Sequence, residues 1–354
     1  MIKYLGSKRR MLGSILEAVA SVPRAGTVID LFSGTSRVGH ALKAAGYRVR
    51  ANDHNSYAQA LARCYVEADR EELLRDVERL VAELNRLPGQ PGWFTQTFCI
   101  QSRYFQPRNG ERVDAIRQSI AARELPPRLE AVLLVSLMEA ADRVDSTTGV
   151  QMAYLKSWAP RSHRELELRV PALLPRASAG AGEAHGLDAL QAAERLEGDV
   201  AYIDPPYNQH SYLRNYHVWE SLVRWDQPEV YGVARKRVDC RERISDFNVR
   251  GRFAAAMERL VDAARAPVLI VSASDESWLT GEQLAALLAR RRQVTVLEYE
   301  QRRYVGAQIG IYNPSGVKTG KVGHLRNREL LFLVDCEARG GIDLDRLTLP
   351  GAAE

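Results

Sequence analysis

Cysteine is scarce in this sequence, and the few cysteines are not spaced as metal ligands. The 354 residues include four cysteines, with no CxxC pair among them. This usage excludes the common cysteine metal motifs and gives no reason to expect a disulfide framework. No Ser-His-Asp or Cys-His spacing stands out either, and no cluster of metal-ligating residues appears. The sequence therefore predicts no metal site, and we expect the thiols to be reduced.

Long hydrophobic runs are also missing. No apolar run approaches the roughly 20 residues that a membrane span needs. The chain starts with a basic stretch, but the residues after it include Glu17 and Pro23, which makes them a poor signal-peptide core. We therefore expect a cytoplasmic protein with no membrane partner.

The charge of the chain is nearly balanced. It has 49 Lys and Arg against 44 Asp and Glu, a net charge of +5, which permits an anionic partner without requiring one. Apolar residues make up 45% and charged residues 26%, which are close to the averages for globular proteins. The length fits two domains, or one large α/β domain with an insertion.

The first part of the chain is typical of an α/β sheet. Residues 27–32 form an apolar run that ends at a small-residue turn, residues 38–45 read as a helix, and residues 47–51 read as a second strand. This order predicts the opening of a doubly wound, Rossmann-like sheet. Further strands are expected at 200–203, 268–271, 294–299 and 329–334, with helices at about 253–264 and 282–290.

Residues 57–185 differ in character. Helical periodicity dominates them as far as about residue 178, for example over 71–87 and 129–144, and a small-residue stretch at 177–185 reads as a surface loop. We interpret residues 57–185 as a helical insertion. The sheet domain would then comprise residues 1–56 and 186–335, followed by a C-terminal tail of residues 336–354.

The most specific motif is Asp204-Pro205-Pro206-Tyr207, directly after the predicted strand 200–203. Two successive prolines fix φ and lack N–H donors, so this loop is stiff and presents acceptors only. The Asp204 carboxylate and the Pro205 carbonyl can each accept one hydrogen from an exocyclic amine, while Tyr207 can stack on a planar base. The alternative is a proline-stiffened turn in which Asp204 is a cap.

A second motif runs from Asp30 to Gly39, between the first strand and the first helix of the sheet. Asp53 stands at the end of the next strand, and a carboxylate about 20 residues after such a turn typically binds ribose hydroxyls. Ser36 replaces a glycine of the GxGxxG pattern, so a nucleoside without phosphates fits better than NAD. An ordinary strand-to-helix turn is the alternative.

A third motif is the segment Lys3-Tyr4-Leu5-Gly6-Ser7-Lys8-Arg9, where Gly6 and Ser7 indicate a turn and Lys8 can reach a carboxylate. A basic N-terminal tail is the alternative.

Together the three motifs resemble the Dam-like, alpha-group DNA adenine N6-methyltransferases, which use S-adenosylmethionine. The order of the motifs matches, and the resemblance covers roughly residues 1–335. Two longer stretches are also similar. One follows Tyr207. The other comprises the segment around Asn109 together with Thr147 to Lys156, and this second stretch resembles a branch of modification methylases. The Asp-Pro-Pro-Tyr element is shared with some RNA-base methyltransferases.

The resemblance implies a role for each matching residue. Asp204, Pro205, Pro206 and Tyr207 would hold the target amine. Tyr4 and Lys8 would line the methionine end of the cofactor, Asp53 would bind its ribose hydroxyls, and Asp188 would lie near its adenine. The cofactor loop would be formed by Asp30, Phe32, Gly34 and Thr35.

The resemblance predicts a site-specific methyltransferase that acts on a flipped adenine in double-stranded DNA, with a cognate restriction endonuclease as a candidate partner. The helical insertion would supply target recognition. An RNA-base amino methyltransferase on the same fold is the alternative, and a large insertion favours DNA. A catalytically idle nucleic-acid-binding module is a third possibility, against which the intact Asp204 motif argues.

Several further residues have two interpretations. The basic segments 235–250 and 306–328, which include Lys318, Lys321, Arg326 and Arg328, would grip phosphates or form a solvated surface. Four polar residues of the insertion would either read bases or have structural roles, namely Tyr104, Arg108, Asn109 and Lys156. The aromatic residues Tyr212, Tyr216 and Trp219 fit a core or a nucleic-acid platform, while His210 and His217 are interpreted as satisfied polar residues.

Overall fold

The computed structural model describes residues 1–6, 8–302, 326–337 and 341–347. Its centre is a seven-stranded sheet in the order β3-β2-β1-β4-β7-β9-β8. The pairs from β3 to β7 are parallel, whereas β9 is antiparallel to both of its neighbours. The strands are β1 (Thr27–Asp30), β2 (Arg48–Asn52), β3 (Glu183–His185), β4 (Val200–Ile203), β7 (Val268–Ser274), β8 (Gln293–Arg302) and β9 (Arg326–Asp335). This confirms the predicted Rossmann-like α/β sheet.

Helices cover both faces of the sheet, which explains why its strands are continuous apolar runs. Alternate residues point to opposite faces, so Val28 packs with α1 (Leu12–Ala20) and α2 (Arg37–Ala44), while Ile29 packs on the other face. That other face is covered by α8 (Ala189–Arg195), α11 (Arg250–Ala263) and α12 (Gly281–Leu288).

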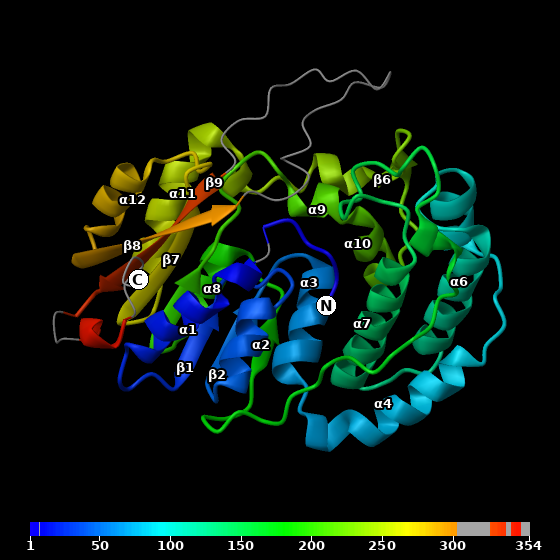
Figure 1. Ribbon diagram of the computed structural model, residues 1–354, viewed down its shortest axis with the longest axis horizontal. Helices are drawn as coiled ribbons and strands as arrows, with labels where there is room; N and C mark the ends of the chain where they lie inside the picture. The colour runs from blue at the N-terminus through cyan, green and yellow to red at the C-terminus, as the bar shows by residue number, and fades with distance from the viewer. Residues whose placement is uncertain (7, 303–325, 338–340, 348–354) are drawn as a thin grey trace.

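The insertion forms a second layer of helices beside the sheet (Figure 1). It contains α3 (Ser56–Ala62), α4 (Arg70–Asn85), α5 (Trp93–Thr95), α6 (Pro107–Ala121) and α7 (Pro127–Arg143). Two helices that follow the Asp204 loop, α9 (Tyr212–Asn215) and α10 (His217–Arg224), pack into the same core through Tyr216, Trp219 and Leu222. The insertion is therefore attached to the part of the chain that follows the Asp204 motif.

The helical prediction is wrong for the last part of the insertion. After Arg143 the chain is irregular apart from one short helical turn, Pro160–His163, and residues 183–185 are strand β3 rather than a loop. Polar side chains of the helices form hydrogen bonds with the backbone of this irregular segment. Asn109 binds the backbone of Ser162, Arg164 and Leu166, and Asn85 binds Leu168 on both its N–H and its carbonyl.

The remaining elements lie after α10 and at the end of the chain. Strands β5 (Val230–Tyr231) and β6 (Lys236–Arg237) form a small hairpin, and 3₁₀ turns follow at Val238–Arg241 and Asp246–Asn248. In the predicted C-terminal tail, Leu347 packs on the core that contains α1 and Asp343 N–H donates to Ser21 O at 2.7 Å.

No helix in the described part of the chain is long and apolar enough to cross a membrane.

Candidate active site

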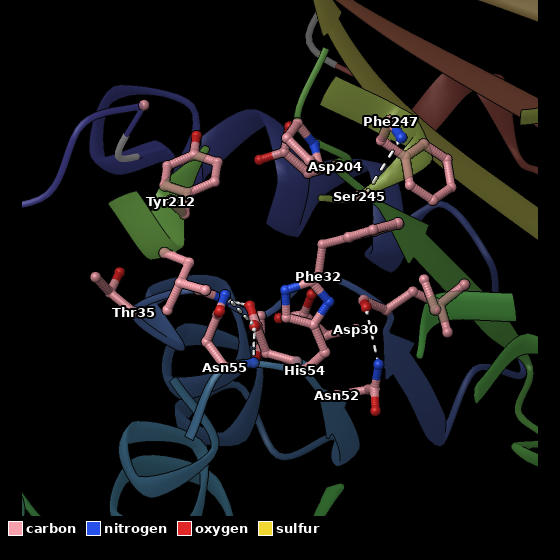
Figure 2. Close-up of a pocket in the computed structure, with 18 of the residues that line it drawn as sticks. Asp30, Phe32, Thr35, Asn52, His54, Asn55, Asp204, Tyr212, Ser245 and Phe247 are labelled. Carbon is pink, nitrogen blue, oxygen red and sulfur yellow. Dashed lines mark hydrogen bonds between the residues drawn. The ribbon is translucent and has the colours of Figure 1, made fainter. Parts of the chain in front are cut away.

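A pocket lies at the carboxyl ends of β1, β2 and β4, where the order of the strands reverses. This is the edge at which open α/β sheets bind their ligands. Of the predicted site residues, ten line the pocket: Tyr4, Lys8, Asp30, Phe32, Gly34, Thr35, Asp53, Asp188, Asp204 and Pro206. The structure thus brings the three motifs together (Figure 2).

The turn after β1 has a tightly bent backbone. Gly34 and Ser36 both have positive φ, of 49° and 56°. A Cβ on Gly34 would lie 3.3 Å from the Tyr4 ring, so glycine leaves room for that ring. Ser36 therefore adopts a conformation that glycine favours, at the position where the GxGxxG pattern has one.

Asp30 ends β1 as a buried carboxyl group with no cationic or side-chain partner on either oxygen among the described residues, and only the backbone N–H of Phe32 approaches it. Burial raises its pKa to about 8, and the nearby charges of Asp204 and Asp53 add to that rise. A buried, unpartnered carboxyl is costly, so it is expected to face a ligand that supplies a positive charge or N–H donors.

Asp53 braces the loops around the pocket. One of its oxygens accepts from Gly34 N–H at 3.1 Å, and the other accepts from the Asn55 backbone and side chain at 2.9 and 3.1 Å. Burial raises the pKa of this carboxyl. Asn52 beside it joins the backbones of Leu31 and Leu187, a role that the sequence motifs did not indicate.

Lys8 connects the N-terminal turn to the Asp204 motif. Its Nζ lies 3.2 Å from Asp204 Oδ1 and 3.1 Å from Glu329 Oε2, and its side chain is 8% exposed. Burial opposes the ammonium form, but the charges of Asp204 and Glu329 outweigh it and raise the pKa of Lys8. Burial raises the pKa of Asp204 to about 6, although Lys8 opposes that rise. Lys8 is thus an ion-pair partner of Asp204 as well as a pocket-lining residue.

Tyr4 is held in a stack of aromatic rings. Its ring is nearly parallel to those of Tyr212 and Tyr216, with centroids 5.0 and 4.6 Å away. The Tyr216 hydroxyl accepts from Leu5 N–H at 2.6 Å, so the residue directly after α9 helps to fix the N-terminal turn. Tyr212 lines the pocket, which sequence reasoning left open, whereas Tyr216 and Trp219 are buried in the core.

The two other residues of the Asp204 motif lie beside the pocket rather than on its lining. Pro205 is buried. The Tyr207 ring is packed partly into the core near α12, with Lys8 Nζ 5.6 Å from the ring centroid. Its carbonyl accepts from Trp278 N–H at 3.1 Å. The stacking of Tyr207 on a base stays a prediction.

The segment after β6, predicted only as a charged loop, supplies one wall of the pocket (Figure 2). Phe247 meets Phe32 edge to face at 5.1 Å. Asn248 Nδ2 donates to Asn208 O at 2.8 Å, which ties this wall to the loop after the catalytic motif. No periodicity marks this segment, and an aromatic residue within a charged run was the only available signal. Pocket residues that sequence reasoning missed include His54, Asn55, Leu187, Ser245, Phe247 and Asn248.

Several candidate nucleic-acid contacts have structural roles instead. Tyr104 and Asn109 are buried and bind backbone carbonyls, so they are not available to read bases. His217 is buried with its Nε2 bonded to Gln151 O, whereas its Nδ1 has no partner among the described residues, so it is only partly satisfied. Arg237 is 1% exposed between Asp226 and Asp239, which excludes it from phosphate binding. Lys318 and Lys321 lie outside the described residues, as does the Arg326 side chain.

Comparison with known proteins gives the class. Residues 4–266 match the family described as D12 class N6 adenine-specific DNA methyltransferase. The chain is 30% identical over 315 residues to the Type II methyltransferase M.NlaIII of Neisseria lactamica, covering 86% of this chain and 92% of that protein. It is 28% identical to the Type II methyltransferase M.FokI of Planomicrobium okeanokoites and 26% identical to the Modification methylase StsI of Streptococcus sanguinis. The chain spans 46% of each of these two longer proteins.

The chain belongs to the D12 class of N6 adenine-specific DNA methyltransferases. This confirms the predicted family and the predicted enzyme, and it does not favour the RNA-base alternative. A methyl donor and a DNA substrate follow from membership of the class. No group of three or more potential His, Cys, Asp or Glu metal ligands occurs in the part of the chain that the structure describes.

Proposed function

We propose that the pocket binds S-adenosylmethionine and that Asp204, at the same end of the sheet, holds the exocyclic amine of a flipped adenine. The observation that carries this proposal is the pair of carboxyl groups, Asp30 buried and Asp204 partly buried, that line one pocket. Among the described residues Asp30 has no cationic or side-chain partner, and Asp204 pairs with one cation, Lys8, which it shares with Glu329.

The donor groups of the pocket fit this cofactor. Its amino group is cationic, and Asp30 offers the unpartnered buried carboxyl that such a group needs. Asp53 at the end of β2 is placed to accept from the ribose hydroxyls, while Phe32 and Phe247 give an apolar surface for a planar adenine beside Asp188. Asp188 also caps α8 by accepting from Leu190 N–H, so its side chain is held at the pocket wall.

The residues around Asp204 then act on the target. The bound cofactor supplies a methyl group on a positively charged sulfur. Transfer to an amine depends on alignment more than on acid or base catalysis. Asp204 and the Pro205 carbonyl would accept the two amine hydrogens. Lys8 keeps Asp204 ionised despite its burial, so that the carboxylate accepts rather than donates.

We also propose that residues 57–185 supply target recognition and that a cognate restriction endonuclease accompanies the enzyme. The first point is supported by the attachment of the insertion to α9 and α10, which follow the catalytic loop. The second is supported by relatives that are named Type II methyltransferases and modification methylases.

Replacement of Asp30 by asparagine tests the cofactor site. We expect this change to weaken binding of S-adenosylmethionine at least tenfold, because it removes the charge that matches the cofactor's amino group. Wild-type binding near pH 7 should release a proton, since the pKa of Asp30 in the free protein is about 8. Calorimetry in buffers of different ionisation enthalpy measures both effects.

The stability of the free protein provides a control for Asp30. A carboxyl whose pKa is raised on folding binds its proton more tightly in the folded state. Its contribution to stability is therefore lost as pH rises from the unfolded pKa, near 4, towards the folded value of about 8. Asp30→Asn should thus melt at a higher temperature than the wild type at pH 8. If Asp30→Asn binds S-adenosylmethionine as tightly as the wild type does, Asp30 is not part of the cofactor site.

Asp53→Ala is expected to cost roughly 1.5–3 kcal/mol of cofactor binding through a lost charge-assisted bond. Asp199→Ala is a matched control, because Asp199 also accepts two backbone N–H groups at the other end of β1, from Gly26 and Thr27, and lies outside the pocket. Calorimetry should show weaker binding for Asp53→Ala alone. Equal affinities for the two variants would mean that Asp53 only braces the turn.

A further inference from the structure

Three exposed apolar side chains stand on separate segments that meet beside α9 and α10, the helices that follow the Asp204 loop. Val233, at the turn of the β5–β6 hairpin, is 77% exposed, Ile100 is 58% exposed and Met152 is 43% exposed. Single exposed apolar residues are ordinary on protein surfaces, but adjoining ones mark a contact surface. We refer to Ile100, Met152 and Val233 as the apolar patch.

Hydrogen bonds between their neighbours show that the three segments adjoin. The hydroxyl of Tyr104 lies 2.8 Å from Gln151 O and 2.9 Å from Ala234 O. The guanidinium of Arg235 donates to Gln101 O at 3.4 Å. Each of the residues Gln101, Gln151 and Ala234 is next in sequence to a member of the apolar patch, so the buried Tyr104 helps to hold the patch together.

The patch is also fastened to the helix that follows the catalytic loop. Gln151 N–H donates to Asn215 O at 2.7 Å, and the Gln151 side chain accepts from Val218 N–H. Asn215 ends α9, whose first residue, Tyr212, lines the pocket. In Figure 1 the hairpin and α9 lie at the same edge of the molecule. The patch therefore extends the surface around the active site.

Arginines without carboxylate partners surround the patch. Arg103, Arg235 and Arg241 form no ion pair within the described ranges, whereas Arg237 nearby is fully paired. The guanidinium of Arg103 stacks on Trp158 at 4.8 Å and that of Arg241 stacks on Tyr231 at 3.9 Å. Stacking holds a guanidinium in place and leaves its N–H edge available, which suits a phosphate.

We propose that the apolar patch contacts the bases of duplex DNA while these arginines bind the flanking phosphates, so that Val233 takes part in the choice of methylation site. The inference rests on the proposed function, which makes DNA the substrate of this face. Apolar side chains meet bases either at a thymine methyl in the major groove or as a wedge between base pairs. Both are contacts to an apolar nucleobase surface.

The test compares Val233→Ser with Val296→Ser, a change at an exposed valine on the edge strand β8. The probe is a duplex that contains a site the wild type methylates, and fluorescence anisotropy measures its affinity. Val233→Ser should bind roughly tenfold more weakly, the scale of losing one buried aliphatic contact. Val296→Ser should stay within about twofold of the wild type. Equal affinity of the two variants would overturn the proposal.

Modified duplexes identify the type of contact. With a thymine-methyl contact, one thymine-to-uracil change should weaken the wild type and leave Val233→Ser unaffected. With a wedge, 2-aminopurine at the site should brighten more in the wild type than in Val233→Ser. If neither modification separates the two proteins, Val233 does not contact bases. Methylation of the duplex by the wild type is measured first and tests the proposed function on its own. If the wild type methylates the duplex but Val233→Ser binds it normally, the inference about Val233 fails while the proposed function stands.

Discussion

Asp204→Ala is expected to lower the turnover of DNA methylation by at least about 10²–10³-fold, the scale for removing one preorganised electrostatic group. The adenine amine is a poor nucleophile because its lone pair is delocalised into the ring. In the proposed mechanism, Asp204 and the Pro205 carbonyl would favour the pyramidal amine that forms only as the methyl arrives. Because this interaction is stronger in the transition state than in the ground state, its loss falls mainly on kcat.

The other properties of Asp204→Ala should change little. DNA affinity depends mainly on phosphate contacts, and Lys8 keeps Glu329 as its partner, so the site is not left with an unpaired buried cation. Asp204→Asn is a useful companion, because its amide retains one acceptor oxygen and should keep part of the activity. Single-turnover methylation by Asp204→Ala near the wild-type rate would contradict the mechanism.

Tyr207 separates the role of the ring from that of the hydroxyl. Tyr207→Phe should be nearly harmless and Tyr207→Ala costly, because both stacking and packing near α12 need the ring. Single-turnover rates, with melting temperatures to detect a packing defect, distinguish the two losses. A Phe variant as slow as the Ala variant would assign the function to the hydroxyl.

Lys8→Met is expected to have the second largest effect, through the ionisation of Asp204. The rate of the wild type should fall as pH drops through about 6, where Asp204 takes up a proton and becomes a weaker acceptor for its amine hydrogen. A cation at ion-pair distance lowers a carboxyl pKa by about 1–3 units. Without Lys8 the acid limb should therefore move up by at least about one unit, with at least about a fivefold loss of rate near pH 6.

The pH profile distinguishes this electrostatic role from simple disruption of the loop. Lys8→Met should regain much of its rate at high pH, where Asp204 ionises without help, and Lys8→Arg should keep the wild-type acid limb. Single-turnover rates between pH 5 and 9 measure both. A Lys8→Met variant that is slow by the same factor at every pH would show that Lys8 only supports the structure of the site.

Much of the site could be predicted because its motifs lie at the ends of neighbouring parallel strands. Asp30, Asp53 and Asp204 follow β1, β2 and β4, which are adjacent in the sheet, so their side chains meet at one edge. The apolar runs of these strands are visible in the sequence because both faces of the sheet are covered.

The residues that were missed depend on pairings that the sequence does not encode locally. Glu329 reaches Lys8 because β9 inserts antiparallel between β7 and β8, an order that strand patterns alone do not give. The wall formed by Ser245, Phe247 and Asn248 has no regular period. The irregular chain after Arg143 was predicted as helical because nothing nearby reveals that Asn85 and Asn109 bind its backbone.

The most direct test of the central claim is nucleoside analysis after methyl transfer. The wild type and Asp204→Ala are incubated with S-adenosylmethionine and either plasmid DNA or total RNA, and the digested nucleosides are measured by mass spectrometry. The account predicts N6-methyladenine in DNA with the wild type, at least about a hundredfold less with Asp204→Ala, and no methylated product in RNA. Methylated cytosine, a product in RNA, or equal N6-methyladenine from both proteins would contradict it.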